Sequence, residues 1–168
     1  MDDFSQFVSS WETYYLLSGT AAATLIGLLF VAISVGQESF RARASTHLQL
    51  FGGLTFNSFF YVLLISILFL IPGMNEWGLG LPLLFLGLSA LIGAVLQHRQ
   101  ARRIPSHRFG TDVARRFYVP MICLAGVTVI GGLVLFHVWQ SLYGLVAVVI
   151  FLLASASQNA WALLTQSP

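Results

Sequence analysis

The sequence predicts an all-α fold, an integral membrane bundle of five transmembrane helices, on three observations. Only 8% of the 168 residues are charged, whereas about a quarter are charged in an ordinary soluble domain. Hydrophobic residues make up 57% of the chain. Finally, the charges are clustered, and the segments between the clusters contain no Asp, Glu, Lys or Arg: 13–37, 44–75, 77–98 and 117–168. So little charge cannot cover a water-exposed surface, which excludes a soluble globule.

The length of these segments predicts the number of spans. A bilayer core about 30 Å thick takes roughly 20 helical residues at 1.5 Å each. The first three segments therefore hold one span each, and the fourth is long enough for two. Its one polar break is the stretch His137–Ser141. The predicted spans, which form a single transmembrane domain over residues 1–168, are 15–35, 49–71, 77–96, 117–137 and 143–164.

The distribution of basic residues predicts the orientation. All eight basic residues are arginines, and in the five-span reading all of them lie in loops on one side of the membrane. Arg41 and Arg43 lie in the first loop, and the other six lie in the loop 97–116. Cytoplasmic loops carry an excess of Lys and Arg. We therefore expect the N-terminus outside and the C-terminus in the cytoplasm.

The first residues do not have the composition of a signal peptide. Asp2, Asp3 and Glu12 are acidic, and no basic residue precedes the first span, whereas a signal peptide begins with a basic region. We expect a short acidic tail outside the membrane. Aromatic residues at the span ends agree with these boundaries. They are Trp11, Tyr14, Tyr15, Trp77, Trp139 and Tyr143 at the outer interface, with Tyr118 and Trp161 near the inner one.

A stripe of small residues in the first span predicts a close helix contact. Gly19, Ala23 and Gly27 follow one another at four-residue spacing. Membrane helices pack where small residues let their backbones approach. The partner is either another helix of the same chain or a second copy in a homo-oligomer. Weaker small-residue pairs occur at Ser89/Gly93 and Ala156/Ala160.

Few polar side chains lie at membrane depth. Asn57 is roughly 12 Å from the inner end of its span by helical rise, and Thr24 is expected at a similar level. Since an amide in hydrocarbon needs a partner, Asn57 is predicted to face the bundle and bond Thr24 or Thr20. It is either a structural contact or one that touches a solute. Near the inner end, Gln158 and Asn159 suggest a polar layer together with Gln37, Gln49 and Gln97.

The loop 97–116 is the one sizeable soluble element. Its arginines, each worth about 1 kcal/mol near an anionic head group, are Arg99, Arg102, Arg103, Arg108, Arg115 and Arg116. The loop either sets the topology alone or also binds anionic lipid or a partner protein. It offers no aromatic platform for stacking bases, so no nucleic acid is expected. Thr111 or Asp112 is predicted to cap a helix that runs into the fourth span.

Several function classes are excluded by missing residues. The predicted spans contain no ionisable acid or base of the kind that proton-coupled carriers, pumps and voltage sensors require, and no catalytic constellation or zinc pattern appears. His47 and His98 fall at inner span ends, where haem ligands are not usually found. Cys123 reads as a small packing residue. We expect no enzyme, no cofactor and no metal.

Two segments carry a resemblance to known proteins. The run GTAAATLIGLLFVA at 19–32 and the segment NAWALL at 159–164 resemble small, uncharacterised multi-pass bacterial membrane proteins. The resemblance implies the bacterial inner (plasma) membrane and carries no activity. The leading hypothesis is a non-enzymatic protein that acts through helix packing, as a homo-oligomer or an accessory subunit of a membrane complex. The alternative is a channel or facilitator for a neutral or weakly selective solute, lined by Thr24, Asn57 and the inner glutamines.

Overall fold

The chain is all-α over the residues that the computed structural model describes, which are 3–35, 46–101 and 111–165. These residues form six α-helices and a short 3-10 turn, η1, and contain no strand. The elements are α1 (Asp3–Ser9), α2 (Glu12–Val35), α4 (Thr46–Phe69), α5 (Glu76–Ala101), α6 (Thr111–Leu135), η1 (Trp139–Ser141) and α7 (Leu142–Thr165). The all-α part of the predicted fold class is confirmed over these residues.

Three of the helices are long and apolar enough to cross a membrane, over Glu12–Val35, Glu76–Gly93 and Trp139–Trp161. The two remaining long helices carry shorter apolar segments among the described residues, Thr55–Phe69 and Val119–Leu135. Large apolar side chains also cover the outside of the bundle. Leu17, Phe30 and Phe85 are each at least 70% exposed, as expected of helices surrounded by lipid rather than water.

Each of the five predicted helical segments coincides with one long helix. The largest differences flank the arginine-rich loop, because α5 continues to Ala101 and α6 already begins at Thr111. The loop predicted at 97–116 is therefore helical at both of its ends. Helices continue past the apolar segment because arginine is itself a good helix former. The helix α6 begins at Thr111, and the side chains of Thr111 and Asp112, the two predicted cap residues, lie outside the described residues.

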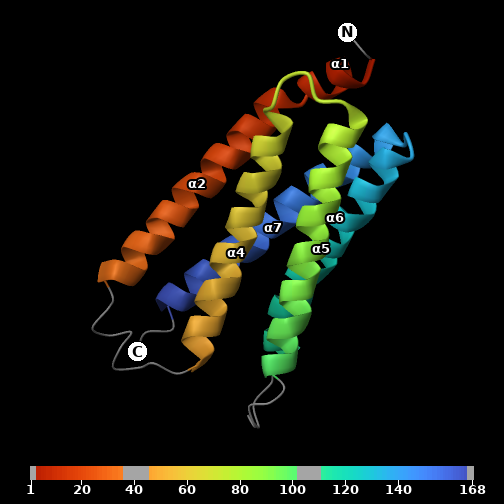
Figure 1. Cartoon of the computed structure of the whole chain (residues 1–168). Coiled ribbons are helices and arrows are strands. Elements are labelled where there is room, and N and C mark those ends of the chain that lie inside the picture. The colour runs from red at the N-terminus through yellow and green to blue at the C-terminus, as the bar shows by residue number, and fades with distance from the viewer. Residues whose placement is uncertain (1–2, 36–45, 102–110, 166–168) are drawn as a thin grey trace.

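The five long helices alternate in direction, so the N- and C-termini lie at opposite ends of the bundle (Figure 1). The main contacts join α2 to α4, α4 to α7, α7 to α6 and α6 to α5. In this order α2 is the edge helix on one side (Figure 1). We call the end that holds α1, the 70–75 turn and the 136–141 turn the α1 end. The bundle core is apolar, with Ala22, Val62, Leu83, Val127 and Leu145 all at most 1% exposed.

The short helix α1 is an element that the sequence analysis missed. Residues 3–9 were expected to form an acidic tail, but they form a helix across the α1 end of the bundle (Figure 1). Phe4 and Val8, one helical turn apart, are 3% and 5% exposed and belong to the main apolar core. At seven residues the helix is far shorter than a membrane span, so a search for spans passes over it.

Candidate functional site

The α1 end is closed by a layer of aromatic side chains that joins α1 to the rest of the bundle. The Phe4 ring meets the Trp139 ring edge to face, with centroids 5.6 Å apart. Phe7 packs in the same way on Tyr143 at 5.9 Å, and Trp11 packs on Tyr143 at 5.0 Å. Each edge-to-face pair contributes about 0.5–1.5 kcal/mol beyond the area it buries. Three of the predicted outer aromatic residues, Trp11, Trp139 and Tyr143, therefore pack within the protein.

Two tyrosines extend this layer into the α2–α4 and α2–α7 contacts. The Tyr15 ring is 1% exposed and stacks on Phe69 of α4, with centroids 3.8 Å apart. The Tyr14 hydroxyl donates a hydrogen bond to the carbonyl oxygen of Val146 in α7 at 3.3 Å. In contrast, Trp77 is 58% exposed on the outside of α5. The outer aromatics thus divide between internal packing and the exposed surface.

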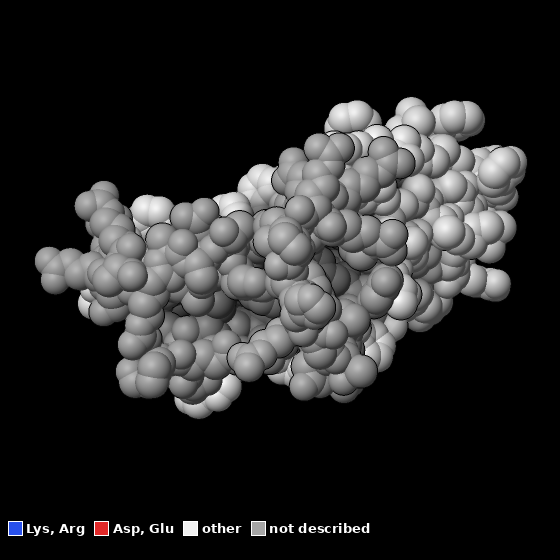
Figure 2. All heavy atoms as spheres, turned by 90° about the horizontal axis from the view of Figure 1, so that it is seen from below, with Lys and Arg blue, Asp and Glu red and all other residues white. Residues whose placement is uncertain are grey.

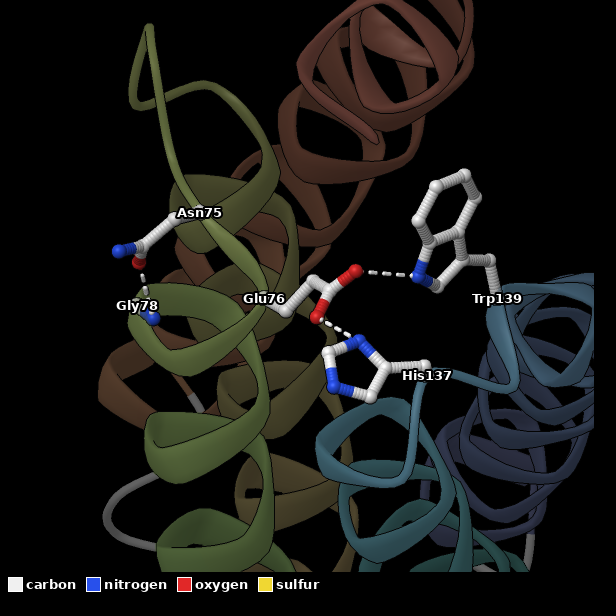
Figure 3. Close-up of polar contacts among 5 residues, drawn as sticks. All are labelled: Asn75, Glu76, Gly78, His137 and Trp139. Carbon is white, nitrogen blue, oxygen red and sulfur yellow. Dashed lines mark hydrogen bonds and ion pairs between the residues drawn. The ribbon is translucent and has the colours of Figure 1, made fainter. Parts of the chain in front are cut away.

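A polar cluster lies beside this aromatic layer and links α5 to the turn between α6 and α7 (Figure 3). The indole N–H of Trp139 donates to Oε1 of Glu76, with nitrogen and oxygen 2.6 Å apart. Nδ1 of His137 pairs with the other carboxylate oxygen, Oε2. The Glu76 side chain is 15% exposed and the His137 side chain 71% exposed. A carboxylate that receives two partners from one turn fixes that turn against α5.

The backbone positions both partners of the cluster. Asn75 caps α5, because its Oδ1 accepts a bond of 2.7 Å from the Gly78 amide (Figure 3), and Glu76 then occupies the first turn, where a negative charge is favoured. At the end of α6, the amide of His137 bonds the Val134 carbonyl and the amide of Val138 bonds the Leu133 carbonyl. This is a Schellman ending, which places His137 at φ +62°, a position usually taken by glycine.

The closest helix approach is between α5 and α6, and it depends on glycines that the sequence analysis did not select. A Cβ added at Gly131 would lie 2.6 Å from the Leu84 amide nitrogen, and one at Gly87 would lie 2.7 Å from the Thr128 amide nitrogen. A Cβ at Gly80 would lie 3.2 Å from the Gly131 carbonyl oxygen. The seven-residue spacing of Gly80 and Gly87 is the signal that could have predicted this contact.

Of the three residues in the predicted small-residue stripe of α2, one packs against another helix of the chain. Gly19 is buried, and a Cβ there would lie 2.8 Å from the Cβ of Ser66 in α4. Ala23 and Gly27 are exposed, and a Cβ at Gly27 would meet nothing within 4 Å. The face that α2 buries consists of Tyr15, Ser18, Gly19, Ala22 and Leu29. The packing face is thus rotated from the predicted stripe, because the large Tyr15 and Leu29 direct it.

The predicted bond between Asn57 and a threonine of α2 does not form. Thr20 and Thr24 are exposed, and their hydroxyls donate to carbonyl oxygens of their own helix, those of Leu16 and Thr20. The reason is register. Since Gly19 lies opposite Ser66, Asn57 lies about 13 Å further along α4 and Thr24 only about 7 Å further along α2. Asn57 is half-buried, whereas Thr24 is exposed on α2.

The remaining predicted polar residues lie toward the end opposite α1. Asn159 is 5% exposed, while Gln158 beside it is exposed. In the weaker small-residue pairs, Ala156 is 1% exposed and Ser89 is exposed. His47 lies in α4 and His98 lies in α5. The side chains of both histidines lie outside the described residues, and so do those of Gln37, Gln49 and Gln97.

The arginine side chains of the predicted lipid-binding loop also lie outside the described residues. Arg99 belongs to α5, and Arg115 and Arg116 belong to α6, whereas Arg102, Arg103 and Arg108 fall between these helices. Figure 2 views the molecule from the end opposite α1. The described atoms in that view belong to neither acidic nor basic residues, and both described carboxylates, Glu12 and Glu76, begin helices at the α1 end.

Within the described ranges, no three His, Cys, Asp or Glu residues are grouped closely enough to hold a metal ion. Cys123 is buried in α6 as a free thiol. No family model, curated protein or solved structure matches this chain. The function is therefore argued from the fold and the surface chemistry alone.

The Glu76 cluster was missed by sequence reasoning, although its parts were visible. Glu76 is the single charge between the second and third predicted spans, and His137 and Trp139 form the polar break before the fifth. The five-span prediction places all three at the same end. Their pairing depends on α5 packing beside α6, which the sequence pattern does not specify.

Proposed function

We propose that the chain is a five-span protein of the bacterial inner membrane, with the α1 end outside and the C-terminus in the cytoplasm. Five helices of 24–26 residues support five crossings, since about 20 residues span the hydrocarbon core. All eight arginines fall in or beside the two connections at the end opposite α1, as the positive-inside rule requires.

Within that membrane the protein acts without catalysis, through helix packing. It assembles as a homo-oligomer or as an accessory subunit of a membrane complex. The observation that carries this proposal is the free small-residue face of α2. Ala23 and Gly27 are exposed on the edge helix of the bundle, with open space around Gly27. Such a face lets a helix of another chain approach closely in lipid.

The arginine-rich connection between α5 and α6 binds anionic head groups in this proposal. Its six arginines would each contribute about 1 kcal/mol near a negatively charged leaflet. This attraction fixes the orientation of the bundle and concentrates anionic lipid beside α5 and α6. Protein reconstituted in mixed liposomes that recruits no excess of anionic over zwitterionic lipid would remove this part of the proposal.

Cysteine cross-linking in native membranes tests the association face. The Cys123→Ser chain removes the one natural thiol, and Gly27→Cys then places a single cysteine on the α2 face. Oxidation should give a covalent homodimer or a defined adduct with a partner. The matched control is Ala154→Cys, an exposed small residue on α7, which should cross-link far less. Equal cross-linking of both variants would refute the proposed face.

A reporter fused after Pro168 tests the topology. Five spans with an outer N-terminus predict a cytoplasmic reporter. A periplasmic reporter would mean that one of the helices does not cross the membrane.

A further inference from the structure

The cluster of Glu76, His137 and Trp139 has a property that goes beyond helix association. Of the described residues other than glycine, His137 is the one with a positive φ, +62°. Left-handed backbone is costly for residues with a side chain. Glycine at this position would relieve that cost, yet the chain has an imidazole there that pairs with Glu76. This retained strain indicates that the imidazole itself has a role.

Glu76 is the centre of a connection that reaches three parts of the α1 end. Through His137 and Trp139 it holds the α6–α7 turn against the start of α5. Trp139 in turn supports the Phe4 ring of α1 at 5.6 Å. Because α1 is only seven residues long, it has little stability of its own. Its position depends on the contacts of Phe4 and Val8 with the bundle.

One of the two partners of Glu76 is a histidine. Histidine changes charge between about pH 5 and 8. The ion pair exists when His137 is protonated and Glu76 is ionised. Such an ion pair is lost when the imidazole gives up its proton, whereas an indole N–H donor such as that of Trp139 does not titrate. With the α1 end outside, as proposed above, the cluster faces a compartment whose pH follows the medium.

The other titratable groups that the structure describes at this end are carboxylates and phenols. Glu12 begins α2, while Tyr14, Tyr15 and Tyr143 supply phenols from α2 and α7. As residue types, carboxylates change charge mainly below about pH 5.5 and phenols mainly above about pH 8.5. The part of α1 that touches Trp139 is the apolar Phe4. The side chains of Asp2 and Asp3 lie outside the described residues.

We propose that Glu76, His137 and Trp139 form a proton-dependent clasp that holds α1 down on the outer end of the bundle. At acidic pH both bonds to Glu76 are made and α1 is fully seated. At alkaline pH the pair with His137 weakens, the turn loosens, and α1 is released more often. Because the pair is partly exposed, the change in the released population is about two- to five-fold.

Thiol accessibility on α1 tests the clasp. In the Cys123→Ser chain reconstituted in lipid, Val8→Cys places a thiol at a position that is 5% exposed, and Ser9→Cys places one at an exposed neighbour. A membrane-impermeant maleimide modifies both, and the ratio of the two rates cancels the effect of pH on the thiols. The ratio for Val8→Cys over Ser9→Cys should rise about two- to five-fold between pH 5.5 and 8.5.

Variants of the cluster separate the clasp from a purely structural turn. His137→Gly relieves the positive φ but removes the imidazole, so the ratio should be high at both pH values. Glu76→Gln keeps an acceptor for Trp139 but no charge, so the pH dependence should disappear. His47, His98 and His107 remain in both variants. A pH-independent ratio in the parent chain, or a pH dependence that survives His137→Gly, would overturn the proposal.

Discussion

The α5–α6 contact and the outer face of α2 both present glycines on long apolar helices, but the surroundings of these glycines are opposite. At Gly87 and Gly131 the backbone of the neighbouring helix occupies the space where a side chain would be. At Gly27 that space is open for at least 4 Å. The first region is a completed contact within one chain, and the second is a surface of the same chemistry without an internal partner.

This difference shows that small residues at helical spacing permit close approach but do not identify the partner. Glycines seven residues apart in α5 meet α6, and in α2 the buried face is set by Tyr15, Ala22 and Leu29 rather than by the small-residue stripe. In a membrane, where water does not drive helices together, a free stripe on an edge helix leaves room for a helix of another chain, which is the association that we propose.

The largest effect is expected where a backbone would be displaced. Gly131→Ala should destabilise the bundle by about 1–3 kcal/mol, because its Cβ overpacks against Leu84. Gly93→Ala, on the same pair of helices but with nothing within 4 Å of the new Cβ, should be neutral or stabilising. Reversible unfolding in mixed micelles measures both. If both substitutions lowered the free energy of unfolding equally, the difference between an occupied and an open glycine would be refuted.

The α2–α4 contact should give an intermediate effect. Gly19→Ala brings a Cβ to 2.8 Å from the Cβ of Ser66, and we expect a loss of about 1 kcal/mol. Adding Ser66→Gly removes the opposing atom, so the double variant should recover part of the overpacking loss in a double-mutant cycle. Gly27→Ala, two turns further along α2, is the control and should not destabilise. Additive costs in the cycle would show that these two residues do not touch in lipid.

The smallest effect is expected at a buried hydroxyl of the same contact. Ser66 is 2% exposed, and its Oγ has no hydrogen-bond partner among the described residues. A buried unpaired polar group is unfavourable, so Ser66→Ala should be neutral or stabilising, by up to about 1 kcal/mol, in the same unfolding measurement. A clear loss of stability would mean that the hydroxyl is satisfied in the membrane.

The sequence predicted the helices well because charge scarcity and span length are local properties. Each predicted segment coincides with one long helix, and the polar break at residues 137–141 is indeed the turn before α7. The short helix α1 escaped prediction, since Phe4 packs on Trp139, which is more than 130 residues away along the chain.

The side-chain contacts between helices were predicted less well because they depend on rotation and register. Shifting the buried face of α2 by a fraction of a turn exposes Ala23 and Gly27, and the α2–α4 register separates Thr24 from Asn57. Likewise, the contact of Glu76 with His137 requires α5 to lie beside α6. The spacing of residues within one helix predicts neither the rotation of a helix nor its register against a neighbour.

The central claim is that the free face of α2 associates with another chain, and counting subunits in lipid tests it most directly. Labelled protein at high dilution in liposomes is counted by stepwise photobleaching, for the parent chain, Gly27→Leu, and the control Ala154→Leu on α7. If the protein is a homo-oligomer, the parent and the control should show more than one subunit per particle. Gly27→Leu should then be monomeric with its fold intact. If the protein acts as an accessory subunit, the same substitution should abolish co-purification of a partner. A monomeric, partner-free parent, or an assembly unchanged by Gly27→Leu, would contradict the account.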